Sequence, residues 1–173
     1  VVSDLASDLM RPESWRDLAH ELNKPAEWVN EMTLAKVWDA DPLTHDQLFK
    51  KVIAKAQAEM SLKMFLTGIK AYWEEAPLEI GNYQGKVNLV KGWDVMFEKL
   101  NEHLGSLSSM RLSPHFGFIK ADANVADDEL NQVRLVLDTL VDVQRRWVYL
   151  QGIFGASADI RHQLPVESSH FEK

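Results

Sequence analysis

The chain has 173 residues, 46% hydrophobic and 26% charged, with a formal net charge of −7 and no cysteine. These are ordinary values for about one soluble globular domain. The acidic balance argues against broad binding to nucleic acid or to an anionic membrane, and no apolar run approaches the ~18 residues of a membrane span. Without cysteine, disulfides, thiolate zinc sites and cysteine nucleophiles are excluded.

Residues 1–42 are predicted to form short helices separated by prolines. Pro12 and Pro25 stand where the first residue of a helix is expected. Thr33 is placed to cap a third short helix, which Pro42 brings to an end.

A long helix is predicted over residues 44–75, because apolar residues recur at helical spacing while lysines and glutamates occupy the other positions. Pro77 ends it. Residues 78–91 then alternate in polarity, with turn residues at Gly81-Asn82 and at Gln84-Gly85. This pattern indicates a two-stranded β-hairpin.

Helical spacing returns over residues 92–110 and again over residues 125–154, where Asn124 or Asp127 is expected to cap the second long helix. The stretch between these two helices is predicted to be mostly irregular. After a break at Gly155, residues 157–173 are expected to begin further short helices.

The predicted fold class is mainly α: an elongated antiparallel helical bundle with one small β-hairpin near residues 78–91. The two long helices would reach ~48 and ~45 Å, whereas a compact domain of this size is nearer 30 Å across. Large aromatic residues are the expected structural anchors of this bundle, since such side chains are costly to leave in water. They are Trp15, Trp38, Trp73, Trp93, Trp147 and Tyr149.

No sequence motif points to catalysis, a cofactor or a metal. The glycine-rich phosphate-binding patterns are absent; Gly85-Lys86 is followed by Val87, which lacks the magnesium-binding hydroxyl. The six histidines are scattered without an i, i+4 pair. Glu74-Glu75 and the acidic run at 127–129 could supply acid-base groups, but both lie at predicted helix ends, and the second would be stabilised there by the helix dipole.

Arg145-Arg146-Trp147 admits two interpretations. It could be a phosphate or nucleotide patch with a stacking ring. In an acidic chain, with Asp138 and Asp142 upstream, salt bridges along the helix are favoured.

Five blocks of the sequence are distinctive. In chain order they are RPESWRDLAHEL, LAKVWDAD, AQAEMSLKMFLTGIKAYW, NYQGKVNLVKGWDVMFEKLNEHLGSLSSMRLSP and VDVQRRWVYLQGIFGASADIRHQLPVESSHF. They resemble, in the same order, blocks of dynein heavy chains, most of all the cytoplasmic type: the first three resemble successive helices and the fourth resembles the hairpin and helix that follow. The last block is the most specific. Glu13-Ser14 before Trp15 is a small departure from the basic residues common in the family.

The resemblance implies a piece of a longer protein, the tail-proximal part of the linker. Residues 1–42 would lead in from the tail, and 43–173 would be the N-terminal part of the linker. In that family the linker swings across an AAA+ ring as ATP is hydrolysed, which drives movement toward the microtubule minus end. The resemblance implies ATP and Mg²⁺ only in the full-length motor, the ring and tail, microtubules, accessory chains and dynactin as partners, and a cytoplasmic, microtubule-associated location.

Two alternatives remain open from the residues alone. One is a free-standing helical scaffold or adaptor that presents an apolar groove to a partner helix. The other is a helical enzyme that uses the carboxylate clusters, which would require those carboxylates to converge in a pocket.

Overall fold

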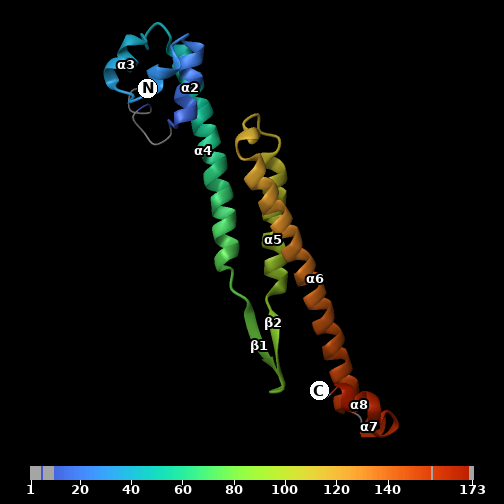
Figure 1. Ribbon diagram of the computed structural model, residues 1–173. Coiled ribbons are helices and arrows are strands. Elements are labelled where there is room, and N and C mark those ends of the chain that lie inside the picture. The colour runs from blue at the N-terminus through green and yellow to red at the C-terminus, as the bar shows by residue number, and fades with distance from the viewer. Residues whose placement is uncertain (1–4, 6–9, 157, 172–173) are drawn as a thin grey trace. The chain divides into compact units, whose positions relative to one another are not determined.

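The computed structural model describes Leu5, residues 10–156 and residues 158–171. Helices dominate it, with one two-stranded antiparallel sheet (Figure 1), so the prediction of a mainly α fold with one hairpin is confirmed. The chain divides into two compact units. Unit 1 comprises residues 1–74 and 107–124, and unit 2 comprises residues 75–106 and 125–173. The elongated shape of the bundle stays a prediction.

The elements described in the first part of unit 1 are α2 (Pro12–Glu21), the 3₁₀ helix η1 (Ala26–Val29), α3 (Leu34–Asp39) and α4 (Asp46–Glu75). Pro12 is the first residue of α2, and the Thr33 hydroxyl accepts a hydrogen bond from the backbone N–H of Lys36, as expected of a cap. Pro25 differs from the prediction, because it precedes a single 3₁₀ turn instead of starting an α-helix.

The core of unit 1 lies where these short elements pack on the first half of α4. Phe49 and Leu18 are fully buried at its centre. Trp15 and Trp28 are half-buried and pack against it. The other buried members are Leu5, Met10, Val37, Ala40, Val52, Ile53 and Ala56.

Unit 2 contains the hairpin formed by β1 (Glu79–Tyr83) and β2 (Val87–Lys91). Tyr83 pairs with Val87, and Gln84 and Gly85 both have positive φ in the turn between them. Positive φ at two successive residues suits the right-handed twist of a hairpin. The other expected turn, Gly81-Asn82, was wrong, because both residues lie within β1 and are paired with β2.

Two further helices extend through both units: α5 (Trp93–Met110) and α6 (Lys120–Ala156), with the 3₁₀ helix η2 (Phe116–Phe118) between them. The predicted start of the second long helix was wrong. Ile119, Ala123 and Ala126 are each 2% exposed. Because these apolar residues are buried at helical spacing, α6 begins earlier and includes residues that were expected to be irregular. Asn124 and the acidic run at 127–129 therefore lie inside α6 and do not cap it.

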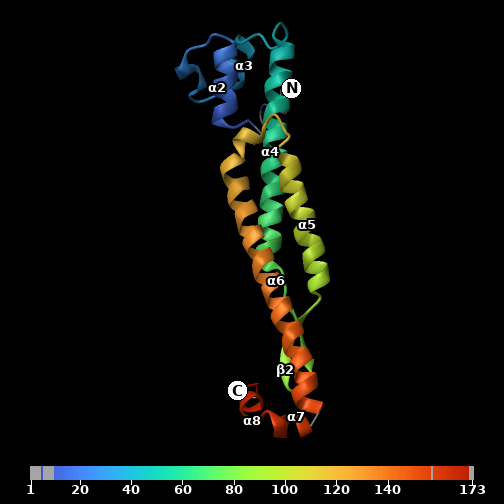
Figure 2. The ribbon, with the colours of Figure 1, turned by 90° about the vertical axis from the view of Figure 1, so that its right-hand side faces the viewer.

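The chain ends in two short helices, α7 (Ala158–Gln163) and α8 (Pro165–Phe171). Figure 2 shows both at the C-terminal end of α6, with β2 beside α6. Of the predicted segment 157–173, residues 157, 172 and 173 lie outside the described residues.

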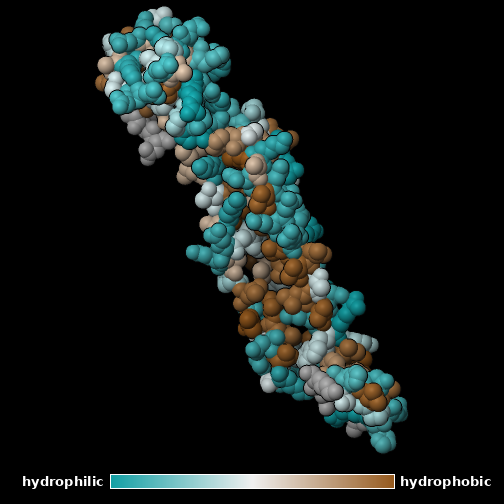
Figure 3. All heavy atoms as spheres, in the orientation of Figure 1, coloured by the Kyte–Doolittle hydropathy of each residue, from teal (hydrophilic) through white to brown (hydrophobic). Residues whose placement is uncertain are grey.

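The buried residues of α6 recur at alternating spacings of three and four residues. Ala123, Ala126, Leu130 and Leu137 follow this order, with Val133 half-buried between the last two. Such a stripe is typical of a helix packed in a coiled-coil manner. Apolar side chains also reach the surface, as at Leu135 and Val136, and Figure 3 shows hydrophobic side chains gathered on part of one face.

Candidate functional site: the junction of the hairpin with helix α6

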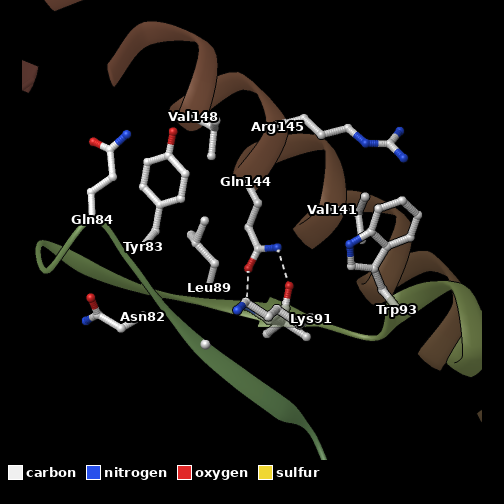
Figure 4. Close-up of a pocket in the computed structure, with 12 residues that line it drawn as sticks. Asn82, Tyr83, Gln84, Leu89, Lys91, Trp93, Val141, Gln144, Arg145 and Val148 are labelled. Atoms are coloured by element: carbon white, nitrogen blue, oxygen red, sulfur yellow. Dashed lines mark hydrogen bonds between the residues drawn. The ribbon is translucent and has the colours of Figure 1, made fainter. Parts of the chain in front are cut away.

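The most specific polar contact of unit 2 joins the hairpin to α6. The backbone N–H of Val90 donates to Oε1 of Gln144 at 2.7 Å, and Nε2 of Gln144 donates to the carbonyl of Val90 at 3.1 Å (Figure 4). Because both backbone groups of Val90 bond to Gln144, they point away from β1. The carboxamide of Gln144 thus occupies the place of a third strand at this point of the sheet edge.

Gln144 owes its position to the stripe of buried residues on α6. Gln144 lies three positions after Val141 and seven positions after Leu137, and each of these two residues is 5% exposed. A polar residue at such a position is costly unless it is hydrogen-bonded. Here both ends of the amide are satisfied, so the side chain specifies which residue of β2 meets this turn of α6.

A pocket of about 390 Å³ lies beside this contact. Figure 4 shows the side chains of Tyr83 and Leu89 facing α6, opposite Val148. The volume lies at the small end of the range for ligand sites. None of the residues that line it is an aspartate, a glutamate or a histidine, so it offers no carboxylate or imidazole for acid-base chemistry.

Aromatic rings continue the junction toward the C-terminal helices. Tyr83 in β1 meets Trp147 in α6 edge to face, with ring centroids 6.1 Å apart. Trp147 stacks on Phe171 of α8 at 5.8 Å, and Phe171 stacks on Phe154 at 5.3 Å. Each such pair contributes about 0.5–1.5 kcal/mol beyond its buried area. The rings therefore tie the hairpin, α6 and α8 together.

The two adjacent arginines of α6 have different roles. Arg146 forms an ion pair with Asp142 at 2.9 Å, which confirms the interpretation as a salt bridge along the helix. The Arg145 guanidinium lies 4.6 Å from the centroid of the Trp93 ring, a cation–π contact that the sequence did not predict. This contact links the start of α5 to α6 within unit 2.

The expected aromatic anchors separate into two groups. Trp15, Trp73, Trp93 and Trp147 are half-buried. Trp38 and Tyr149 are 63% and 70% exposed, so the expectation that they anchor the core of this chain was wrong. The reason for Trp38 is geometric: α3 has six residues and buries Val37, so the next side chain points away from that core.

A second polar junction lies in unit 1, and it too was not predicted from the sequence. Glu59 of α4 lies at a core position and accepts a hydrogen bond of 2.6 Å from Arg11. The Arg11 guanidinium also lies 3.8 Å from the centroid of the Phe118 ring. Lys55 bonds Asp17 at 2.5 Å, and this hydrogen bond raises the pKa of Lys55. These contacts fasten α2 to α4.

Neither junction has the features of a metal or membrane site. Over the part of the chain that the structure describes, no three histidine, aspartate or glutamate side chains lie close enough together to hold a metal ion. Among the same residues, no helix combines the length and the apolar character needed to cross a bilayer.

The family model described as "Dynein heavy chain, N-terminal region 2" matches residues 1–173, the entire chain. The chain belongs to the dynein heavy chain family. It is 43% identical over 173 residues to the cytoplasmic dynein heavy chain of Dictyostelium discoideum and 42% identical over 172 residues to that of Caenorhabditis elegans. The cytoplasmic dynein heavy chain of Drosophila melanogaster is 38% identical over 173 residues.

Each of these alignments covers 99% of this chain and 4% of the dynein heavy chain it matches. The helical fold and the two junctions described above therefore belong to a segment that corresponds to a small part of a motor protein. The resemblance of the sequence blocks to the dynein heavy chain family is confirmed.

Proposed function

We propose that this chain is a mechanical segment of a dynein heavy chain, the tail-proximal part of its linker, which carries conformational change from the ATPase ring to the tail. The match of the whole chain to the N-terminal region of dynein heavy chains is the observation that carries the proposal. The junction of the hairpin with α6, where Gln144 binds Val90, supports the proposal. A segment that transmits force needs contacts that resist sliding between its elements.

The chemistry of the motor belongs, in this proposal, to other parts of the heavy chain. ATP and Mg²⁺ are bound outside residues 1–173, whose sequence has no phosphate-binding loop. Microtubules, accessory chains and dynactin are partners of the whole motor in the cytoplasm. The role of this segment is to keep its helices and hairpin in fixed register while the ring changes shape.

The test separates ATP hydrolysis from movement in the full motor. Gln144→Met removes the amide that holds Val90 while keeping a similar side-chain volume. We expect the variant motor to hydrolyse ATP at close to the normal rate but to move microtubules more slowly in a gliding assay. Gln132→Met, at an exposed position of the same helix, is the matched control and should leave both rates unchanged.

Two results would refute the proposal. One is an unchanged gliding velocity in the Gln144→Met motor when hydrogen exchange shows that the joint at Val90 has opened. The other is an equal loss of ATPase activity and velocity, which would place the defect in catalysis instead of transmission.

A further inference from the structure

A second pocket of unit 2 lies where the hairpin turn reaches the last turns of α6. Its volume is about 290 Å³. Three aromatic rings line it, those of Trp147, Phe154 and Phe171, together with two cationic side chains, Lys86 and Arg161. The hairpin turn supplies the lysine and α7 supplies the arginine, so the two cations come from separate elements.

The cations of this pocket lack counter-charges. None of the residues that line it is an aspartate or a glutamate. Within the described ranges, neither Lys86 nor Arg161 forms an ion pair, although the chain carries 26 acidic residues against 19 basic ones. Both side chains are exposed, and two positive charges without an acidic neighbour in the lining give the pocket a local positive potential, which favours an anion.

The end of α6 accounts for part of this arrangement. The Nζ of Lys86 lies 3.9 Å from the position that a Cβ on Gly155 would occupy, close to the helix C-terminus at Ala156. The carbonyls at the C-terminus of a helix are together equivalent to about half a negative charge. Two full positive charges exceed that amount, so the pocket keeps a net positive field.

The size and lining of the pocket select the kind of anion. A volume of about 290 Å³ falls below the usual range for small-molecule sites and suits one or two side chains. An arginine fork matches a carboxylate, and the three rings offer apolar surface to a neighbouring side chain. A segment that carries an acidic residue beside an apolar one would satisfy both features.

We propose that this pocket binds an aspartate or glutamate side chain from a segment of the heavy chain outside residues 1–173. The inference rests on the proposed function in one respect, namely that this chain works as part of a heavy chain. The chain matches about 4% of the length of the dynein heavy chain of Dictyostelium discoideum. Binding there would fix the end of α6, and with it the hairpin turn, to another part of the motor.

Zero-length cross-linking of the intact heavy chain tests this directly. A carbodiimide joins a lysine amine to a carboxylate only when the two are in contact. We expect Lys86 to be joined to one aspartate or glutamate outside residues 1–173, identified by mass spectrometry. Lys91 is the control: it ends β2, the strand that follows Lys86, and it does not line this pocket. It should not give that product.

Arg161→Glu provides the decisive variant, because it keeps the reactive lysine and reverses the second charge. The cross-link yield at Lys86 should fall about tenfold or more, as expected for loss of a charge-assisted hydrogen bond. Arg134→Glu, an exposed site on α6, is the matched control and should leave the yield unchanged.

The proposal is overturned if Lys86 is joined only to carboxylates within residues 1–173, if it gives no product, or if Arg161→Glu leaves the yield intact. These results do not depend on ATP hydrolysis or movement. If the Gln144→Met motor gives a result that refutes the proposed function while Lys86 still forms the cross-link, only the proposed function is refuted. If the motor behaves as proposed and the cross-link is absent, only the proposal for the pocket is refuted.

Discussion

The Glu59 carboxylate lies 2.6 Å from the Arg11 guanidinium, and the two side chains are only 12% and 18% exposed. They are separated by 48 residues along the chain, so the pair joins the start of α2 to the middle of α4. Desolvation makes such a pair weak evidence of net stability, but loss of one partner leaves an uncompensated charge.

Glu59→Gln should therefore lower the free energy of unfolding by about 2–3 kcal/mol. Urea unfolding of the chain measures this. Glu98→Gln, at an exposed position of α5, is the control and should change stability by less than about 0.5 kcal/mol. Equal effects at the two positions would contradict a structural role for the pair.

Replacing both Arg11 and Glu59 by methionine should restore much of the stability lost in Glu59→Gln, because no buried charge then remains.

Gln144→Met should destabilise the chain by about 1–3 kcal/mol, because it leaves the N–H and carbonyl of Val90 without partners. Hydrogen exchange gives a local measurement. The Val90 amide should exchange faster in the variant, and Gln132→Met should leave its exchange unchanged. Continued slow exchange at Val90 would mean that water does not reach this strand and that Gln144 is not what protects it.

Trp147 contacts the rings of both Tyr83 and Phe171. Trp147→Ala should cost about 2–3 kcal/mol in thermal or urea unfolding, less than a fully buried tryptophan because the ring is half-buried. Tyr149→Ala, two residues away and 70% exposed, is the matched control, for which a change below about 0.5 kcal/mol is expected. A larger loss at Tyr149 than at Trp147 would reverse the assignment of anchors.

His103 is 8% exposed, and burial lowers its pKa, with the charge of Lys99 acting in the same direction. The imidazole of His103 therefore binds a proton more readily in the unfolded chain than in the folded chain. The contribution to stability is present above the unfolded pKa, near 6.5, and is lost as the pH falls toward the lower folded value.

Comparison of the wild type with His103→Gln measures this effect. The wild type should lose more stability than the variant between neutral and mildly acidic pH, as seen in urea unfolding at several pH values. His20→Gln, at an exposed position, should follow the wild type. Parallel pH dependence in the wild type and His103→Gln would contradict the assignment.

The hairpin turn holds Gln84 at a φ of 54° and Gly85 at 72°. A residue with a Cβ is strained in this region, whereas glycine is not. Gln84→Gly should raise stability by about 0.5–1 kcal/mol, and Gly85→Ala should lower it by about 1 kcal/mol. Thermal unfolding of the two variants should show shifts of opposite sign. A loss of stability in Gln84→Gly would mean that the glutamine side chain contributes more than the backbone strain costs.

Local chemistry was sufficient to predict most helices and the hairpin. Pro12 at a helix start, Thr33 as a cap and Gln84-Gly85 at a turn each act within a few residues, so their effects can be recognised in the sequence. The same local signals misplaced the start of α6. Asn124 and Asp127 are good capping residues, but burial of Ile119 and Ala123 carried the helix past them.

By itself, the sequence determined the family, the mainly α class and the position of the hairpin, because these depend on residue patterns and on short-range spacing. Only the tertiary structure decided which polar residues hold the fold together. Gln144 meets Val90 across 54 residues and Arg11 meets Glu59 across 48. Such pairs follow from which helix faces come together, and an isolated glutamine or glutamate within an apolar stripe does not specify its partner. Burial selected Trp147 over the nearby Tyr149 in the same way, because only one side of a helix can face its neighbours.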